Sequence, residues 1–228
     1  MRKLSIYIGL FLIISSCKKL NDPVENPPRG NSYLKFIHAN PAAPALDLYS
    51  QYYNQTNKIG VEISHKKSLP PIGYMQLQSS DNPTSSGVGT YWIHTRAAQT
   101  KDTINQPTTI LLSKDKYQTL FSIDSAGTPK LLIFEDNFQK PDSGFALFRF
   151  FNANLNSGKL TLTNGTNPSN PVDFMNISNF VNVSATNHNF TVLDENGNSL
   201  QTLNLTLKNK VAYTFFFSDS LYYSQQTE

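Results

Sequence analysis

The chain has 228 residues, of which 39% are hydrophobic and 15% charged, and its formal net charge is +3. This composition supports a sizeable core and excludes an intrinsically disordered protein. No block of Lys and Arg is long enough to contact several phosphates from one face, so we expect no nucleic-acid partner. The single cysteine, Cys17, excludes a disulfide framework, a Cys-rich zinc site and a catalytic cysteine in the folded body.

The first residues have the features of an export signal. Arg2 and Lys3 precede an apolar run of 11 residues, 4–14, which is short for a membrane span but has the length of a signal-peptide core. Without the two basic residues the chain keeps 17 basic and 16 acidic residues, a net charge of +1. We therefore expect residues 1–16 to be a signal peptide that is removed.

The residues that follow this run, Ser15-Ser16-Cys17, resemble the signal of bacterial lipoproteins. In that family the cysteine thiol receives a diacylglycerol, the chain is cut before the cysteine, and the new amine is usually acylated. The resemblance implies lipidation of Cys17 and stable attachment to a membrane. Lys18 instead of Asp follows the cysteine, which favours the outer membrane, facing the periplasm or the cell surface. An ordinary secretory leader with a chance cysteine is the alternative.

Residues 17–31 are expected to form a flexible tether behind the lipidated cysteine. They contain Pro23, Pro27, Pro28 and Gly30 and little apolar material. Such a composition is typical of an extended, disordered linker, which here would hold the body away from the membrane.

From residue 32 onward the chain has the signature of β-strands. Its apolar runs are short, rich in β-branched or aromatic residues, and bounded by Gly, Pro, Asn and Ser. No window has a helical period long enough to predict a helix, although short helical turns at Asn54–Lys58 or Pro171–Asn176 are compatible with the sequence. The expected strands are Tyr33–His38, Ala45–Tyr49, Gly73–Gln78, Gly89–Thr95, Thr108–Leu112, Tyr117–Asp124, Lys130–Glu135, Phe145–Asn152, Lys159–Thr163, Val172–Asn176, Phe180–Val183, His188–Asp194, Ser199–Leu207, Val211–Ser218 and Leu221–Ser224.

Three short sequences between these strands predict turns. Asn164-Gly165 and Asn196-Gly197 carry the dipeptide that is typical of tight hairpins. Asp124–Gly127 joins two apolar strands and is expected to form a third turn.

One stretch of the chain occurs twice. Tyr33–Asn40 matches Leu147–Asn154 with an offset of 114 residues (147 − 33), and the same offset relates Leu46 to Leu160. An offset that is maintained across a loop indicates a duplicated unit.

A second pair of matching stretches supports the duplication. Tyr117–Asp124 resembles Ala212–Asp219 with an offset of 95 residues (214 − 119). The first copy is therefore 19 residues longer (114 − 95), and the polar loops Asp81–Gly87 and Lys101–Pro107 are the expected insertions. The sequence predicts an all-β chain of two tandem β-sandwich domains, residues 32–138 and 145–228.

Within the first copy, Phe36–Tyr49 resembles the opening of the family called domain of unknown function 4397. Gly73-Tyr74, Thr90-Tyr91 and Tyr117–Phe121 also occur where that family has similar residues. The resemblance implies an extracytoplasmic, immunoglobulin-like β fold that is common in lipoproteins of Bacteroidota. It implies no activity.

This resemblance covers most of residues 32–136 and, more faintly, 145–219. The second copy lacks the loop Pro41–Pro44, and Thr161 replaces Asp47. If the motif has a role beyond folding, the first copy is where we expect it.

The sequence contains no recognisable catalytic, metal or cofactor site. None of His38, His65, His94 and His188 is spaced from another histidine or from a cysteine as metal ligands are. Nucleophile-elbow, phosphate-loop and calcium-loop motifs are absent. We therefore expect no enzyme activity; a hydrolase would need a pocket that joins two carboxylates or a Ser/His pair.

Several other residues have two interpretations. Asp47 is either a ligand-binding carboxylate or a strand-end residue that accepts backbone hydrogen bonds. Glu135-Asp136 is either a pair of functional carboxylates or a solvated strand end. Tyr52, Tyr53 and Trp92 either stack on a sugar or fill the core.

Taken together, these features predict a lipid-anchored cell-envelope protein that is a non-catalytic binding or structural module. Its ligand, a glycan or an envelope protein, is not specified by any motif. The alternative is a carbohydrate-binding accessory lipoprotein of a glycan uptake system, in which Tyr52, Tyr53 or Trp92 would line one concave face.

Overall fold

The computed structural model describes residues 32–52, 55–58, 75–76, 89–98, 100, 102–113 and 115–226. The expected signal peptide, Cys17, the tether, Tyr53, His65 and the insertion Asp81–Gly87 lie outside the described residues. The described part consists of strands, turns and loops without a helix, which confirms the all-β prediction. Accordingly, no helix in this part is long and apolar enough to cross a membrane.

The strands form two sets, which we call the first unit (β1–β8) and the second unit (β9–β15). The first unit contains β1 (Tyr33–His38), β2 (Leu46–Tyr52), β3 (Gln55–Lys58), β4 (Met75–Gln76), β5 (Gly89–Ala97), β6 (Thr108–Leu112), β7 (Tyr117–Ser125) and β8 (Thr128–Glu135). The second unit contains β9 (Phe145–Asn152), β10 (Thr161–Thr163), β11 (Val181–Ser184), β12 (Asn187–Leu193), β13 (Ser199–Thr206), β14 (Ala212–Phe217) and β15 (Leu221–Gln226).

Two of the local expectations are wrong. Gln55–Lys58 is strand β3 and not a helical turn, because its backbone pairs with β2 from Tyr49 to Tyr52. Val172–Asn176 is neither a strand nor a helical turn. Val172 makes only an isolated bridge to Leu160, and the chain then turns through Met175, whose φ is 65°. In both places tertiary contacts decide a conformation that local propensity leaves open.

The predicted turns differ in detail. Between β7 and β8, Ala126 and Gly127 both have positive φ (54° and 76°), as a two-residue hairpin of the primed type requires. Between β12 and β13, Gly197 has a φ of 81° but Asn196 has no positive φ, so this hairpin is not the tight Asn-Gly type. Gly165 also has positive φ, after β10.

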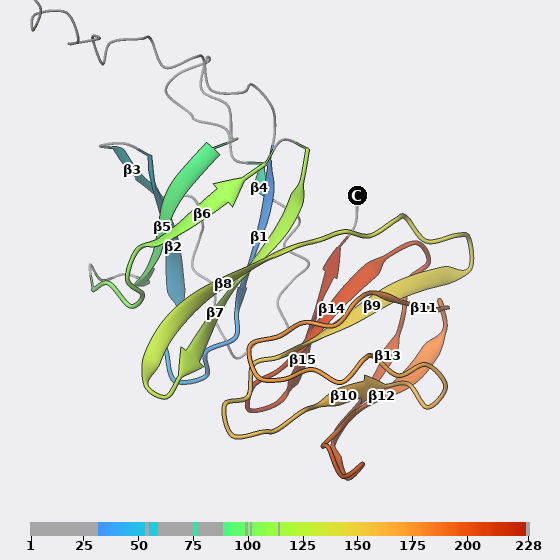
Figure 1. Cartoon of the computed structure of the whole chain (residues 1–228). Coiled ribbons are helices and arrows are strands. Elements are labelled where there is room, and N and C mark those ends of the chain that lie inside the picture. Colours follow the sequence, from blue (N-terminus) through green and yellow to red (C-terminus); the bar gives the residue numbers. More distant parts are fainter. Residues whose placement is uncertain are drawn as a thin grey trace, which may run out of the picture.

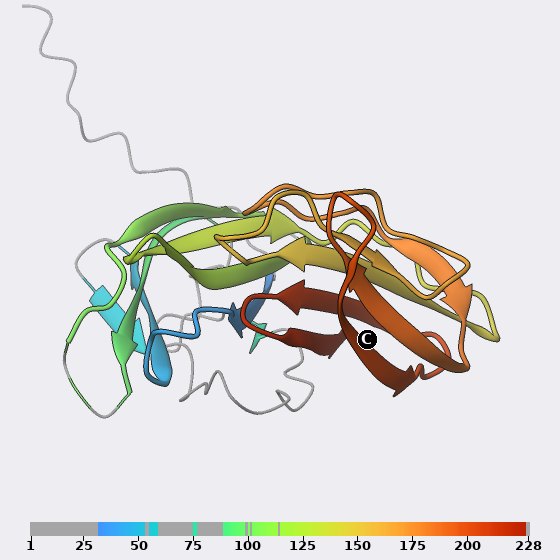
Figure 2. The same ribbon diagram turned by 90° about the horizontal axis from the view of Figure 1, so that it is seen from below.

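The strands pair into four sheets. In the first unit the sheets have the orders β4-β1-β7-β8 and β3-β2-β5-β6. In the second unit the orders are β11-β9-β14-β15 and β10-β12-β13. Figures 1 and 2 show the two units as neighbouring groups, blue to green and yellow to red.

The matching stretches of the sequence pair in the same way in both units. In the first unit β1 is parallel to β7 and Phe36 lies opposite Leu120. In the second unit β9 is parallel to β14 and Phe150 lies opposite Phe215. These positions differ by the same offsets, 114 and 95, that relate the sequences.

Each unit encloses its own core between two sheets. In the first unit Leu34 and Phe36 from one sheet pack with Leu48 and Ile93 from the other. In the second unit Phe148, Phe150 and Phe215 pack with Leu162 and Phe190. Alternate residues of the strands named here, such as Leu34 and Phe36 of β1 and Phe148 and Phe150 of β9, point into these cores, which is the arrangement of a β-sandwich.

A third core lies between the two units. Ile37, Ala39 and Phe121 of the first unit cluster there with the residues of the second unit at the equivalent positions, Phe151, Ala153 and Phe216. The rings of Phe121 and Phe151 lie 4.1 Å apart between centroids. The two units therefore pack through the same face, and the described part of the chain forms four sheet layers.

Polar groups are buried beside this third core. Arg149 forms an ion pair with Asp136, and its guanidinium also donates to the hydroxyls of Thr119 and Thr214. Lys35 is the first-unit equivalent of Arg149 and donates to the carbonyl of Gln225, 3.4 Å away. Burial lowers the pKa of Lys35 to about 7, an effect opposed by Asp136 and increased by Arg149.

The two neighbouring carboxylates at the end of β8 have separate partners. Asp136 is buried against Arg149, whereas Glu135 forms an exposed ion pair of 2.5 Å with Lys116. Asp136 is thus not a solvated strand end, and both carboxylates are engaged in ion pairs.

Candidate functional site

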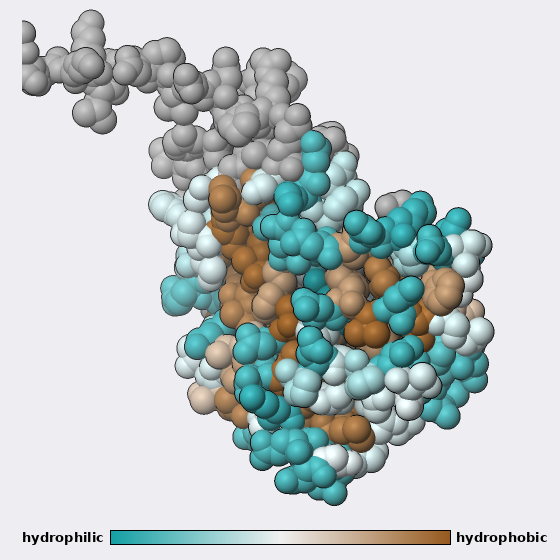
Figure 3. Space-filling view, turned by 45° about the vertical axis from the view of Figure 1, so that its right-hand side comes forward, coloured by the Kyte–Doolittle hydropathy of each residue, from teal (hydrophilic) through white to brown (hydrophobic). Residues whose placement is uncertain are grey.

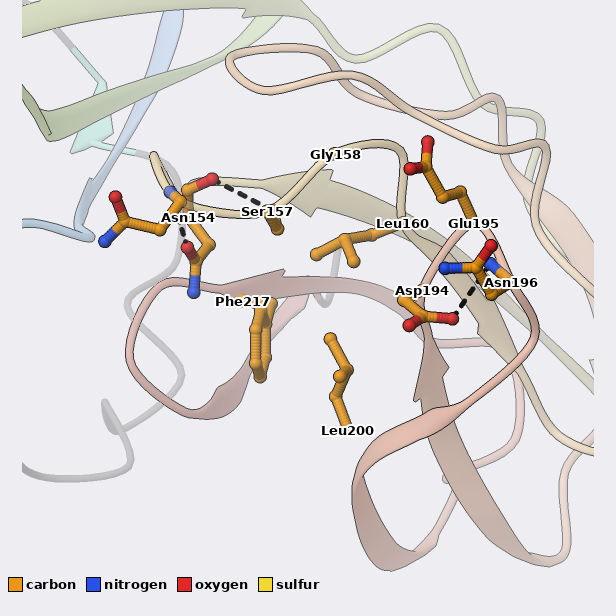
Figure 4. A pocket seen from close by; sticks show the side chains of 10 residues that line it. Asn154, Ser157, Gly158, Leu160, Asp194, Glu195, Asn196, Leu200 and Phe217 are labelled. Carbon is orange, nitrogen blue, oxygen red and sulfur yellow. Dashed lines mark hydrogen bonds between the residues drawn. The ribbon is translucent and has the colours of Figure 1, made fainter.

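A pocket of about 510 Å³ lies at one end of the second unit. The loop after β9, the turn between β12 and β13, and the end of β14 meet there. Figure 4 shows Asn154 and Ser157 on one side of the pocket and Asp194, Glu195 and Asn196 on the other. Leu160, Leu200 and Phe217 lie between these two polar sides.

The loop after β9 is held by its own asparagine side chains. The Asn152 amide donates to the carbonyls of Gly158 (3.1 Å) and Val172 (3.3 Å), and its oxygen accepts from the backbone of Asn154. The Asn154 side chain donates to the Ser218 carbonyl and accepts from the backbone of Asn156. These bonds fix the wall of the pocket that this loop provides.

The opposite wall is the turn Asp194–Asn198. One Asp194 oxygen accepts from the backbone of Asn196 (2.9 Å) and Asn198 (2.8 Å), and the other accepts from the Asn198 side chain (2.9 Å). Hydrogen bonds from Asn198, above all from its side chain, lower the pKa of Asp194, so this carboxylate is ionised. Asp194 therefore organises the turn.

Glu195 differs from its neighbour because its carboxylate has no such constraint. Among the described residues, none forms a hydrogen bond or ion pair with it. Its Oε2 lies over Gly158, where an added Cβ would be 3.1 Å away. The glycine thus leaves room for the carboxylate at the rim of the pocket.

The centre of the pocket is apolar. Leu160 is fully buried and Phe217 nearly so, and both belong to the core of the second unit. Leu200 remains 47% exposed. Apolar surface surrounded by polar side chains is typical of small-molecule sites, which usually measure about 300–1,000 Å³.

The corresponding end of the first unit is built differently. The β5–β6 connection is long there, and it places Asn105 between the two sheets, where its Oδ1 accepts hydrogen bonds from Thr95 and Ser122. Ser122 pairs with His38 in the first unit, and Phe217 pairs with Asn152 at the equivalent position of the second unit. Ser122 and Phe217 are therefore equivalent residues. A buried amide from an inserted loop therefore lies at the end that holds the pocket in the second unit.

The Pro41–Pro44 loop is fastened to its own strand. His38 Nε2 lies 2.9 Å from the Pro44 carbonyl, and His38 Nδ1 accepts from the backbone of Asn40. The Asn40 side chain in turn accepts from Ala42. In the second unit Asn152 and Asn154 make the equivalent contacts, so these bonds belong to the shared turn.

Asp47 lies away from the pocket, in the first unit. It is buried on β2, opposite Arg96 of β5. The neighbouring pair, Tyr49 and His94, stacks at 5.4 Å, and the Arg96 guanidinium lies 4.5 Å from the Tyr49 ring centroid. Burial, and then the charge of Arg96, lower the pKa of His94.

The aromatic residues proposed as a sugar platform are only partly described. Trp92 is 50% exposed on β5, whereas Tyr53 and the side chain of Tyr52 lie outside the described part. Among the residues that the structure describes, Leu111, Phe145, Leu155 and Leu200 are further large exposed hydrophobic residues. Figure 3 shows hydrophobic patches (brown) framed by hydrophilic residues (teal) on one face of the molecule.

Sequence reasoning did not find the pocket. It identified the Asn196-Gly197 turn and the repeated Asn154, but as separate signals. They meet because of the strand register, in which Leu162 of β10 pairs with Val192 of β12. Within the described residues, no group of three His, Cys, Asp or Glu side chains is arranged to hold a metal ion.

No protein-family model matches this chain, and no curated protein does either. Among solved structures, similarity is found to the carbohydrate-binding module CBMbc (family CBM26) of Eubacterium rectale Amy13K in complex with maltoheptaose. The identity is 8% and the TM-score 0.27, over 86% of this chain and 98% of that chain. A candidate cell adhesion protein from Bacteroides uniformis gives 9% identity and a TM-score of 0.20, over 87% and 98%. At these scores the similarities carry no argument about this chain.

Proposed function

We propose that the chain is a non-catalytic binding module of the cell envelope and that the pocket of the second unit is its ligand site. The observation that carries this proposal is the pocket itself. It combines fixed polar walls, an unbonded carboxylate on Glu195 and an apolar centre, which together suit a small polar ligand.

In this proposal the two units are tandem immunoglobulin-like sandwiches, residues 32–138 and 145–228. The repeated strand order and the repeated register of the matching stretches support that interpretation. The resemblance of Phe36–Tyr49 to domain of unknown function 4397 agrees with it.

The envelope location rests on the leader. Ser15-Ser16-Cys17 after a short apolar run supports lipidation of Cys17 and attachment to the outer membrane. Mass spectrometry of the mature protein after growth with labelled palmitate should find the acyl chains on Cys17. An unmodified Cys17 in the mature protein would refute the anchor.

The binding proposal is tested by screening the full chain against glycans and envelope proteins. A neutral or cationic ligand of the pocket should bind more weakly to the variants Glu195→Gln and Leu200→Ala. Leu111→Ala is the matched control, because it removes an exposed leucine from the other unit. Loss of binding in the control alone would move the site to the first unit.

A carbohydrate-binding accessory lipoprotein of a glycan uptake system is the second candidate. The polar rim around Leu200 and Phe217 favours it, since sugars combine hydroxyl groups with apolar ring faces. Half-exposed Trp92 offers a second contact surface for the same class of ligand.

A further inference from the structure

The pocket offers both hydrogen-bond acceptors and donors at its rim. The Glu195 carboxylate is acceptor-only, whereas the Asn156 side-chain amide can donate and accept. Neither side chain forms a hydrogen bond within the described residues. A ligand whose groups act both as donors and as acceptors satisfies such a mixed rim, and hydroxyl groups do both.

The centre of the pocket sets a second requirement. Leu160, Leu200 and Phe217 present apolar surface between the polar walls. A purely polar ligand would leave that surface in water. A ring with hydroxyl groups at its edge and C–H groups on its face covers both kinds of surface.

Charge sets the third requirement. The lining contains two carboxylates, Asp194 and Glu195, and none of its residues is Lys, Arg or His. A ligand carboxylate would face like charges in the site, with no lining cation to offset its desolvation. The hydrogen bonds of Asp194 and Asn152 hold both walls in place, so the site does not rearrange freely to avoid that repulsion.

From these three requirements we infer that the pocket takes a hydroxylated sugar ring that is not acidic, and that Glu195 selects against acidic sugars. This inference rests on the proposed function of the pocket as a binding site. It narrows the ligand class of that site to uncharged or cationic sugar rings, a distinction that the proposed function does not make.

The test uses three rings that differ mainly in charge: glucosamine, glucose and glucuronate. Ligand-observed NMR with the full chain in detergent gives the dissociation constant of each. Glucose and glucosamine should bind, and glucuronate should bind at least tenfold more weakly. In Glu195→Gln, glucose should lose about tenfold in affinity, because a hydrogen bond to a charged acceptor is lost, while glucuronate should gain. Gly158→Ala keeps the charge of Glu195 but displaces its carboxylate, so it should also weaken glucose binding.

Two further measurements separate the possible failures. Nα-acetyl-lysine amide carries a cation without a sugar ring; if it binds as tightly as glucosamine, the pocket recognises charge and the sugar inference is wrong. Equal binding of glucuronate and glucose would also overturn it. Both outcomes leave the pocket as a binding site. If ligands bind but none responds to Glu195→Gln, Gly158→Ala or Leu200→Ala, the proposed function fails as well.

Discussion

The two units share the register of their matching strands and, apart from the added strand β3, the same strand order, yet they close the same end by different means. In the first unit a long β5–β6 connection places the Asn105 amide between Thr95 and Ser122. In the second unit the turn is short, the large ring of Phe217 replaces Ser122, and a pocket remains. The same arrangement of strands thus has a buried polar side chain, Asn105, at this end of the first unit and an open pocket at this end of the second. A binding site can therefore arise by changing a loop and one strand residue.

Replacing Phe217, at the pocket end of the second unit, should have the largest effect on stability. Phe217→Ala removes a buried aromatic ring from the core, and we expect a loss of about 3–5 kcal/mol in the free energy of unfolding. Chemical denaturation measures it. The matched variant Ser122→Ala removes only a hydroxyl and should cost about 1 kcal/mol. Equal losses would show that the two ends are closed alike.

The packed faces of the units differ at the equivalent positions Lys35 and Arg149. The pKa of folded Lys35 is about 7, below the 10.5 of the exposed group, so between these values the unfolded chain binds the proton and the folded chain does not. Stability should therefore rise with pH from about 7 to about 10.5, by up to about 1.4 kcal/mol per pH unit. Below pH 7 both states are protonated and the contribution is constant.

Replacing Lys35 tests whether this residue causes the rise of stability with pH. Lys35→Met should remove it and raise stability near pH 7, because a buried cation is replaced by an apolar side chain. Lys130→Met, at an exposed position of β8, is the control and should leave the dependence of stability on pH unchanged. Denaturation curves at pH 7, 8.5 and 10 measure both; a slope that persists in Lys35→Met would contradict the assignment.

Replacing Asn105, the buried amide at the end of the first unit, should have a smaller effect on stability. Asn105→Ala leaves the hydroxyls of Thr95 and Ser122 without their shared acceptor, and we expect a loss of about 1–3 kcal/mol. Denaturation with and without glucose is the measurement. Sugar binding at the second unit should be unchanged, so a change in affinity would mean that the two ends are coupled.

The turn that borders the pocket should give the smallest effect. Asp194→Asn weakens the bonds to Asn196 and Asn198, so the variant should be slightly less stable at pH 7. The folded pKa of Asp194 lies below its ordinary value of 3.8, so its contribution is complete above that value and is lost as the pH falls through the folded pKa. The difference between variant and wild type should therefore vanish in acid. A difference that persists at pH 2 would contradict this role.

The sequence predicts the strands and several turns because their signals are local. Ala126-Gly127 forms its turn where the sequence indicates one, and the matching stretches around Phe36 and Phe150 occupy equivalent strands. Gln55–Lys58 escaped prediction, because its four polar residues become a strand only by pairing with β2.

The candidate site depends on longer-range geometry. Asp136 and Glu135 are adjacent in sequence, but only the tertiary structure shows that Asp136 binds Arg149 of the second unit and that Glu135 binds Lys116 of its own unit. In the same way, Glu195 is an ordinary turn residue until the register of β10 and β12 brings it over Gly158. No local pattern encodes such a meeting.

The face between the units has one further consequence. Because equivalent residues such as Phe121 and Phe216 meet there, the contact is of the self-complementary kind found in two-fold symmetric dimers. Such a contact is closed, because the face of each unit is covered by the equivalent face of the other unit. A head-to-tail contact would have left one free face at each end, to which further copies could add without limit. The covalent pair is therefore complete with two units, and a third appended copy would need a different surface to attach.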